Sequence, residues 1–202
     1  MSYLEPSDFV YWKQYFIDRV DELRAIAGTP FGFAGACVLI EVLSRLTRGT
    51  GKGKSGRIDY EQFVSDWLPK KYSDFKYAKR VIPPGKEEQD KYLPTQMYCI
   101  LRCGLVHNLS FVAGHSEIAN GATDRSIWML TREEADRLGL NHLDPYEQNG
   151  PPIVDDAALF VAEDFLDDIE VTVRDIFEKA EHDEVLKDNI MKHLSDRCPI
   201  LA

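Results

Sequence analysis

The stretch MYCILRCGLVHNLS, residues 97–110, predicts a helix that is surrounded by protein on every side. At 100° per residue its apolar side chains cover the whole circumference, which is typical of a helix buried in a bundle. Arg102 and His107 interrupt this apolar surface. A buried arginine keeps its charge at any ordinary pH and needs a carboxylate, an anion or an open cleft beside it. Arg102 and His107 are therefore the first candidates for a functional site.

The segments on both sides of this stretch show the same helical spacing of apolar residues. We expect helices over residues 8–27, 31–46, 59–67, 92–109 and 155–182, and a short one that ends near Arg197. The run SIWML, residues 126–130, predicts a strand that pairs with a second one at residues 142–145. The expected fold is an all-α helical bundle with a small β-hairpin insertion at about residues 121–150, before the last long helix.

Length and composition indicate an ordinary globular chain. The 202 residues are enough for one domain, residues 1–202, and 44% hydrophobic residues exclude a disordered protein. The longest apolar run, residues 31–40, is about half the length of a membrane span, and the first eight residues lack a secretory leader. We expect a cytoplasmic protein with no membrane contact, in which the four cysteines are thiols rather than disulfides.

Charge is unevenly distributed along the chain, whose net charge is −10. Residues 43–86 carry eleven Lys and Arg against four acids, whereas residues 155–184 carry twelve acids against two basic residues. Solvated faces are the simpler interpretation of such runs, and binding patches are the alternative. The loop RGTGKGKSG, residues 48–56, is not a P-loop, because Arg48 stands where that motif needs glycine. Lys52 and Lys54 of this basic loop remain candidates for contact with a polyanion.

Arg102 and His107, separated by four residues on a late helix of a small bundle, resemble the R-x4-6-H signature of the HEPN superfamily. Members of this superfamily are all-α domains, and many are metal-independent endoribonucleases. The resemblance implies that Arg102 and His107 are catalytic and that Asn108 helps to bind the substrate. The implied ligand is RNA or a nucleotide, and neither a metal ion nor another cofactor is expected.

This chemistry suits the two side chains. When the 2′-hydroxyl of RNA attacks the adjacent phosphate, a base removes its proton, a cation stabilises the phosphorane oxygens and an acid protonates the leaving oxygen. Histidine titrates near neutral pH, and the guanidinium fork matches phosphate oxygens. Five residues correspond to about 140° of helical rotation, so one helix does not place both side chains on one face. A homodimer in which two such helices meet would form a composite site.

Two other functions remain open. Cys103 stands where many active members carry a polar residue, which favours a HEPN-like module that binds RNA or a nucleotide without cutting it. The acidic last helix favours a partner subunit, for example of a toxin–antitoxin or defence system, that docks a basic antitoxin-type protein.

Structural interpretations compete with these functional ones. Residue chemistry alone favours a structural ion pair between Arg102 and an acid of residues 155–184. A zinc site on Cys99, Cys103 and His107 is not expected, because these residues would span about 12 Å of a straight helix. The remaining histidines lie singly in polar stretches and are predicted to be surface residues: His115, His142, His182 and His193.

Overall fold

The structure is a computed structural model that describes residues 8–48, 56–75, 93–105, 127–143 and 158–197. Of the described residues, 76% are helical, and two short strands form a small parallel sheet. The elements are α1 (Phe9–Arg24), α2 (Pro30–Arg48), α3 (Arg57–Trp67), α4 (Leu93–Gln96), the π-helix η1 (Met97–Leu105), β1 (Ile127–Leu130), α7 (Arg132–Leu138), β2 (Ala158–Val161), α8 (Ala162–His182) and α9 (Glu184–Arg197).

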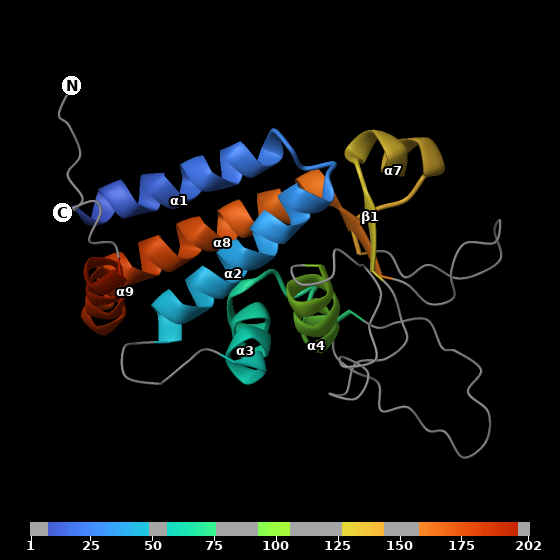
Figure 1. The fold of residues 1–202 in the computed structure, drawn as a ribbon. Coiled ribbons are helices and arrows are strands. Elements are labelled where there is room, and N and C mark those ends of the chain that lie inside the picture. The colour runs from blue at the N-terminus through green and yellow to red at the C-terminus, as the bar shows by residue number, and fades with distance from the viewer. Residues whose placement is uncertain (1–7, 49–55, 76–92, 106–126, 144–157, 198–202) are drawn as a thin grey trace, which may run out of the picture.

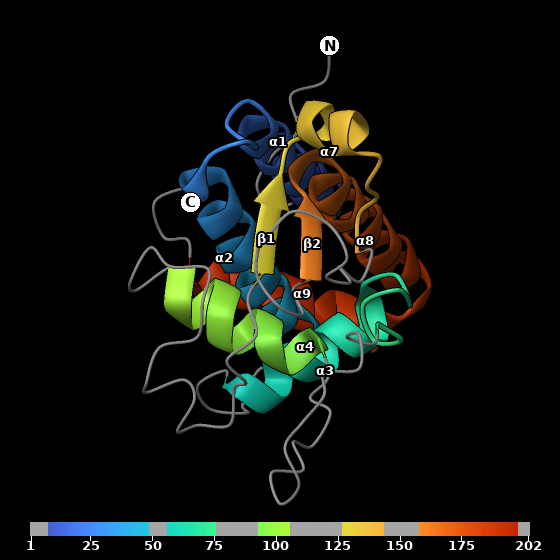
Figure 2. The ribbon, with the colours of Figure 1, turned by 90° about the vertical axis from the view of Figure 1, so that its right-hand side faces the viewer.

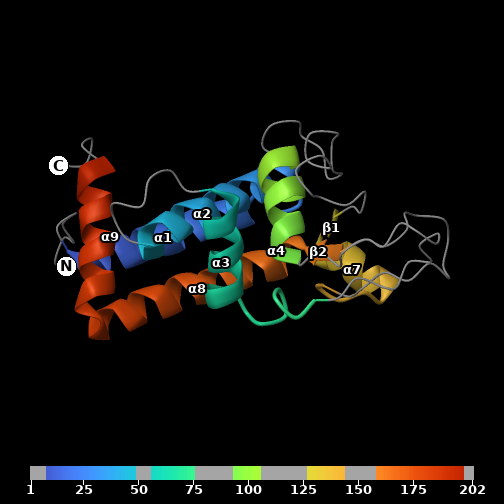
Figure 3. The ribbon, with the colours of Figure 1, turned by 90° about the horizontal axis from the view of Figure 1, so that it is seen from below.

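Three long helices, α1, α2 and α8, lie side by side and form the body of the molecule (Figure 1). The C-terminal helix α9 crosses them at one end, and α3 and the α4–η1 helix run crosswise over α2 (Figure 3). The sheet and α7 occupy the opposite end, where the two strands point in the same direction (Figure 2). The mostly helical architecture predicted from the sequence is therefore confirmed, but the parallel sheet means that the predicted all-α class is not.

Helix α2 lies at the centre because its residues are apolar on nearly every side. It contacts α1, α3, α8, α9 and η1, and Cys37, Ile40 and Leu43 are fully buried. Its small residues allow close approach. A Cβ on Gly32 would lie 2.3 Å from the backbone oxygen of Ile26, so only glycine fits where the α1–α2 turn folds back on the helix.

The length and composition of α2 also meet the criteria for a membrane span. This 19-residue helix has a mean hydropathy of 1.3 over its most apolar window, of which 56% is buried inside the bundle. The core helix of a soluble protein passes the same test, so this result does not indicate a location for the chain.

The predicted hairpin is wrong. β1 pairs in parallel with β2, in the register Ile127↔Ala158 to Leu130↔Val161, and residues 158–161 had been assigned to the start of the last long helix. All four residues of β2, Ala-Leu-Phe-Val, are buried. A short, continuous apolar run has the same sequence pattern in a buried strand and in a buried helix, so periodicity could not separate the two.

Of the predicted second strand, residues 142–145, the structure describes His142 and Leu143, and both are bonded to β2. The Leu143 N–H donates to the Leu159 carbonyl at 2.7 Å, and the Val161 N–H donates to Nδ1 of His142 at 3.0 Å. Leu143 adopts a φ of 62°, which a leucine rarely does. These two bonds attach the segment after α7 to β2.

The sheet end of the bundle is held by a cluster of aromatic rings centred on Phe160. Its ring lies 5.9 Å from that of Phe33 on α2, 5.1 Å from that of Phe165 on α8 and 6.2 Å from that of Tyr72. Phe160 is fully buried. One side chain of the small sheet therefore contacts two of the three long helices.

We predict that Phe160→Ala lowers the free energy of unfolding by about 3–5 kcal/mol, because it leaves a cavity among these rings. Leu138→Ala is the control, since Leu138 on α7 is 57% exposed and its truncation should change stability by less than about 0.5 kcal/mol. Urea denaturation measures both variants. A Phe160→Ala protein as stable as the Leu138→Ala protein would contradict this position for β2.

Candidate functional site

Arg102 lies on η1, nine residues of π-helix that continue from α4. A π-helix is rare because its i→i+5 hydrogen bonds are less favourable than those of an α-helix, and it occurs frequently at functional sites. Several residues of this segment, including Met97, Ile100 and Leu101, are fully buried. A helix is confirmed up to Leu105, but it packs over α2 with Tyr98, Arg102 and Cys103 partly exposed, so it is not surrounded by protein on every side. The π-helical conformation of η1 was not predicted.

The guanidinium of Arg102 pairs with the carboxylate of Glu41. The Nε atom donates to Glu41 Oε2 at 2.9 Å, across from η1 to α2. Arg45, one turn further along α2, donates to the other oxygen of the same carboxylate. The sequence predicts a partner for Arg102 among residues 155–184, but in the part of the chain that the structure describes Arg102 pairs with Glu41, the single acidic residue of α2.

This ion pair is only partly shielded from water. The Arg102 side chain is 24% exposed and that of Glu41 is 13% exposed. Burial works to raise the pKa of Glu41, but the hydrogen bond and charge of Arg102, with those of Arg45, outweigh it and hold the pKa below its usual value. The hydrogen bond from Arg102 to Glu41 raises the pKa of the arginine. Both groups are charged throughout the ordinary pH range.

Two tyrosines surround the pair. The Tyr98 ring centroid lies 5.8 Å from the Arg102 guanidinium carbon, in cation–π range, and 5.5 Å from the ring centroid of Tyr60 on α3. Tyr60 is fully buried, and its hydroxyl has no hydrogen-bond partner in the described part of the chain. Burial raises the pKa of this hydroxyl, and the nearby Glu41 and Arg102 act on it with opposite signs. Arg102, Glu41 and the two tyrosines together form a polar cluster in an apolar region.

The structure locates one of the five predicted site residues. Arg102 is described, whereas Lys52, Lys54, His107 and Asn108 lie in residues 49–55 and 106–126, outside the described ranges. Glu41 was not among the predicted site residues, although an acid within a long apolar helix was a usable signal. Within the described ranges, no cluster of three or more His, Cys, Asp or Glu could hold a metal ion, and Cys37, Cys99 and Cys103 are not in disulfides.

A second polar cluster, missed by the sequence analysis, joins three segments near the sheet. The Tyr72 hydroxyl donates to Asp168 Oδ2 on α8 at 2.7 Å and lies 2.9 Å from Nε2 of His142. Lys71 Nζ lies 2.6 Å from the same carboxylate oxygen. The predicted surface position of His142 is wrong: its side chain is 2% exposed. His182 is exposed, as predicted.

The contacts of His142 define its protonation state. Because Nδ1 accepts the Val161 N–H, the imidazole is neutral and carries its proton on Nε2, which donates to the Tyr72 oxygen. Burial lowers the pKa of His142 and outweighs the opposing hydrogen bond to Asp168. Burial works to raise the pKa of Asp168, but hydrogen bonds from His142, Lys71 and Tyr72 outweigh it and lower that pKa. The cluster is internally satisfied, which indicates a structural role.

The acids of α8 are also partly neutralised within the bundle. Arg24 on α1 reaches Asp167 at 2.6 Å and Glu170 at 2.7 Å, and Arg132 on α7 pairs with Asp164. Part of the acidic run that sequence alone assigned to a solvated or partner-binding face therefore holds helices together.

Comparison of the chain with protein-family models, with curated proteins and with solved structures finds no match.

We predict that His142 makes the protein less stable as the pH falls below about 6.5. The folded pKa lies below the unfolded value, so the unfolded chain takes up a proton first and unfolding becomes more favourable. His142→Gln removes this titration and should lose less stability than the wild type between pH 7.5 and 5.5.

Urea denaturation across this pH range measures the effect. His182→Gln is the control, because His182 is exposed and its removal should leave the pH dependence of the wild type. Equal slopes for the wild type and His142→Gln would show that His142 is not held neutral in the folded state.

Proposed function

We propose that this chain is a HEPN-type, metal-independent endoribonuclease whose Arg102 binds the scissile phosphate. The observation that carries the proposal is the placement of a charged guanidinium on η1, a π-helical segment packed across the central helix α2, where it is oriented by Glu41 and 24% exposed to solvent. A guanidinium that is charged, oriented and open to water can bind a phosphate group. The R-x4-6-H spacing of Arg102 and His107 supports the same function.

Each of the two residues has a defined role in this proposal. Arg102 stabilises the negative charge that develops on the phosphorane oxygens, because a guanidinium donates parallel hydrogen bonds to phosphate oxygens. His107 transfers protons, as base toward the 2′-hydroxyl or as acid toward the leaving 5′ oxygen. Glu41 is a positioning residue, since its bond to Nε fixes the plane of the guanidinium.

A homodimer belongs to the proposal. In a composite site, Arg102 and His107 of two chains would line one cleft. Ile100 and Leu101 are already fully buried within one chain, so a second chain would contact the partly exposed side of η1, which carries Tyr98, Arg102 and Cys103.

Binding without cleavage is the second candidate function. It is favoured by the Glu41 carboxylate, which occupies Arg102 and is shared with Arg45, so that an RNA phosphate would compete with an existing ion pair. Such a module would retain RNA through Arg102 but leave its backbone intact.

We predict that the purified protein cuts single-stranded RNA in the presence of EDTA, leaves 2′,3′-cyclic phosphate ends and spares DNA of the same sequence. DNA is spared because it lacks the 2′-hydroxyl nucleophile. Arg102→Ala and His107→Ala should each lower the cleavage rate by about 100-fold or more. Gel electrophoresis of end-labelled RNA, with mass spectrometry of the products, measures the reaction.

Arg45→Ala is the matched control, because Arg45 binds the same Glu41 carboxylate without belonging to the motif. Arg45→Ala should keep the cleavage activity. If the ion pairs of Glu41 were only structural, Arg45→Ala and Arg102→Ala would have the same effect on cleavage. RNA that binds in an Arg102-dependent manner and stays uncut would support the binding module instead.

We further predict a mass of twice 23.1 kDa by light scattering at micromolar concentration, as a composite site requires. An active protein with the mass of one chain would contradict the composite site and leave cleavage to the residues of a single protomer.

A further inference from the structure

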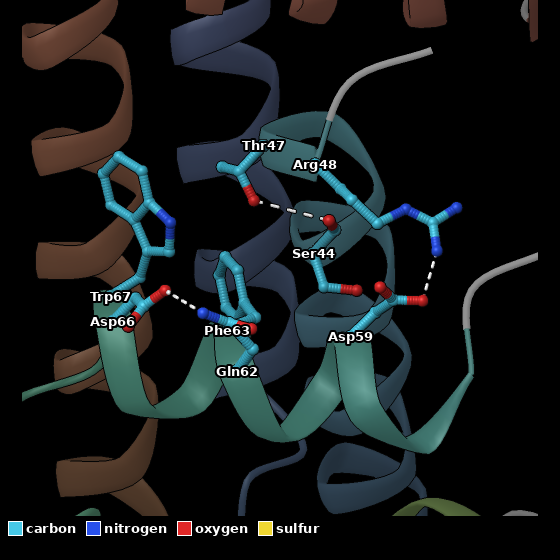
Figure 4. Close-up of a pocket in the computed structure, with 8 residues that line it drawn as sticks. All are labelled: Ser44, Thr47, Arg48, Asp59, Gln62, Phe63, Asp66 and Trp67. Carbon is cyan, nitrogen blue, oxygen red and sulfur yellow. Dashed lines mark hydrogen bonds and ion pairs between the residues drawn. The ribbon is translucent and has the colours of Figure 1, made fainter. Parts of the chain in front are cut away.

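A polar pocket of about 280 Å³ lies between the end of α2 and α3 (Figure 4). We call it the α2–α3 pocket. The last turns of α2 contribute Ser44, Thr47 and Arg48 to its wall. Ligand pockets in proteins enclose roughly 300–1,000 Å³, so this one has room for a small, compact group only.

Helix α3 supplies the opposite wall. The pair formed by Arg48 and Asp59 closes one end, and Asp66 and Trp67 lie at the other (Figure 4). The Asp59 carboxylate already has two partners, because besides pairing with Arg48 it accepts the Gly56 N–H at 3.1 Å and so caps α3. The carboxylate of Asp66, by contrast, lies at the surface and accepts a hydrogen bond from Gln62 at 3.2 Å.

The floor of the pocket combines aromatic and hydroxyl groups. Phe63 and Ser44 are 3% and 2% exposed. The ring of Trp67 is held in place by Lys179 of α8, whose Nζ lies 4.8 Å from the ring centroid. Aromatic side chains offer stacking surfaces to planar groups, and the bases of single-stranded nucleic acids use such surfaces.

Charge decides which part of a nucleotide fits. The pocket contains two carboxylates and one guanidinium that is already paired, so a phosphate would be repelled there. A neutral planar group with hydrogen-bond donors is favoured. The Watson–Crick edge of guanine has two adjacent donors, N1–H and N2–H, which one carboxylate accepts together.

The pocket shares a face of α2 with the Arg102 site. Ser44 follows Glu41 by three residues and Arg48 follows it by seven, and these spacings place all three on one side of the helix. Ser44 donates from its hydroxyl to the Glu41 carbonyl at 2.8 Å. At 1.5 Å per residue, Ser44 and Arg48 lie about 4.5 Å and about 10.5 Å along the helix axis from Glu41, so the α2 wall of the pocket begins close to the Arg102 site.

We propose that the α2–α3 pocket binds a guanine base of the RNA whose phosphate lies at Arg102, with Asp66 as the residue that recognises the base. This inference rests on the proposed function for the identity of the strand, and on the pocket itself for the base. Its consequence is sequence preference: cleavage or binding next to guanine.

The first test measures guanosine 5′-monophosphate against the adenosine, cytidine and uridine monophosphates by isothermal titration calorimetry on the full chain. We expect guanosine monophosphate to bind at least tenfold more tightly than the others. Asp66→Asn should abolish that preference, since the amide replaces one acceptor with a donor. Equal binding of all four nucleotides, or unchanged preference in Asp66→Asn, would overturn the inference.

Asp18→Asn is the matched control. Gln14 and Asp18 on α1 form the same exposed Gln–Asp pair, four residues apart, as Gln62 and Asp66. The two variants should have the thermal stability of the wild type, and only Asp66→Asn should alter nucleotide binding.

The same assay with Arg102→Ala separates this inference from the proposed function. Guanosine, which has no phosphate, should bind Arg102→Ala as it binds the wild type, whether or not the protein cuts RNA. A pentanucleotide with one central guanine should bind more tightly than the mononucleotide and lose that advantage in Arg102→Ala. If guanine binds specifically but the pentanucleotide binds no more tightly than the mononucleotide, the ligand of the pocket is a free nucleotide. If the protein cleaves RNA without a preference for guanine, the pocket takes no part in the reaction.

Discussion

The Glu41 carboxylate is the one charge that the apolar central helix carries in its middle, and much of the structure is arranged around it. Taking a carboxylate out of water is unfavourable unless cations and hydrogen-bond donors replace the solvent. Arg45 supplies one partner from the same helix, and Arg102 supplies the other from η1. The bond that satisfies Glu41 therefore also fixes how η1 crosses α2, so packing and the candidate site depend on the same interaction.

The helices could be read from the sequence because their apolar residues recur with the period of a helix and each element is long. The start of α8 could not. Asp155 and Asp156 have the composition of a helix N-terminus, and Ala158–Val161 continues the apolar pattern, yet the chain forms β2 there and α8 begins at Ala162. A strand of four residues forms only when it pairs with another strand. The partner of β2 is β1, and 27 residues, 131–157, lie between them in the sequence.

The candidate site could be predicted only in part, for a related reason. Arg102 stood out because a permanent charge in an apolar run demands an explanation, and Glu41 satisfied the same criterion. The pairing of the two could not be derived, since it depends on how η1 crosses α2. His142 gave no signal, because a single histidine among polar residues looks like a surface residue until Tyr72, Val161 and Asp168 surround it.

The parallel pairing of the strands has a consequence for the order of folding. A hairpin would close a short loop early, whereas β1 and β2 have to meet across a long intervening segment, at a greater cost in chain entropy. Local contacts within α1, α2 and α8 form without that cost, so we expect the bundle to assemble first and the aromatic cluster around Phe160 to close last. Interactions that form after the rate-limiting step slow unfolding without speeding folding. The packing at the sheet end of the molecule would then set the rate of unfolding, and so the lifetime of the folded state.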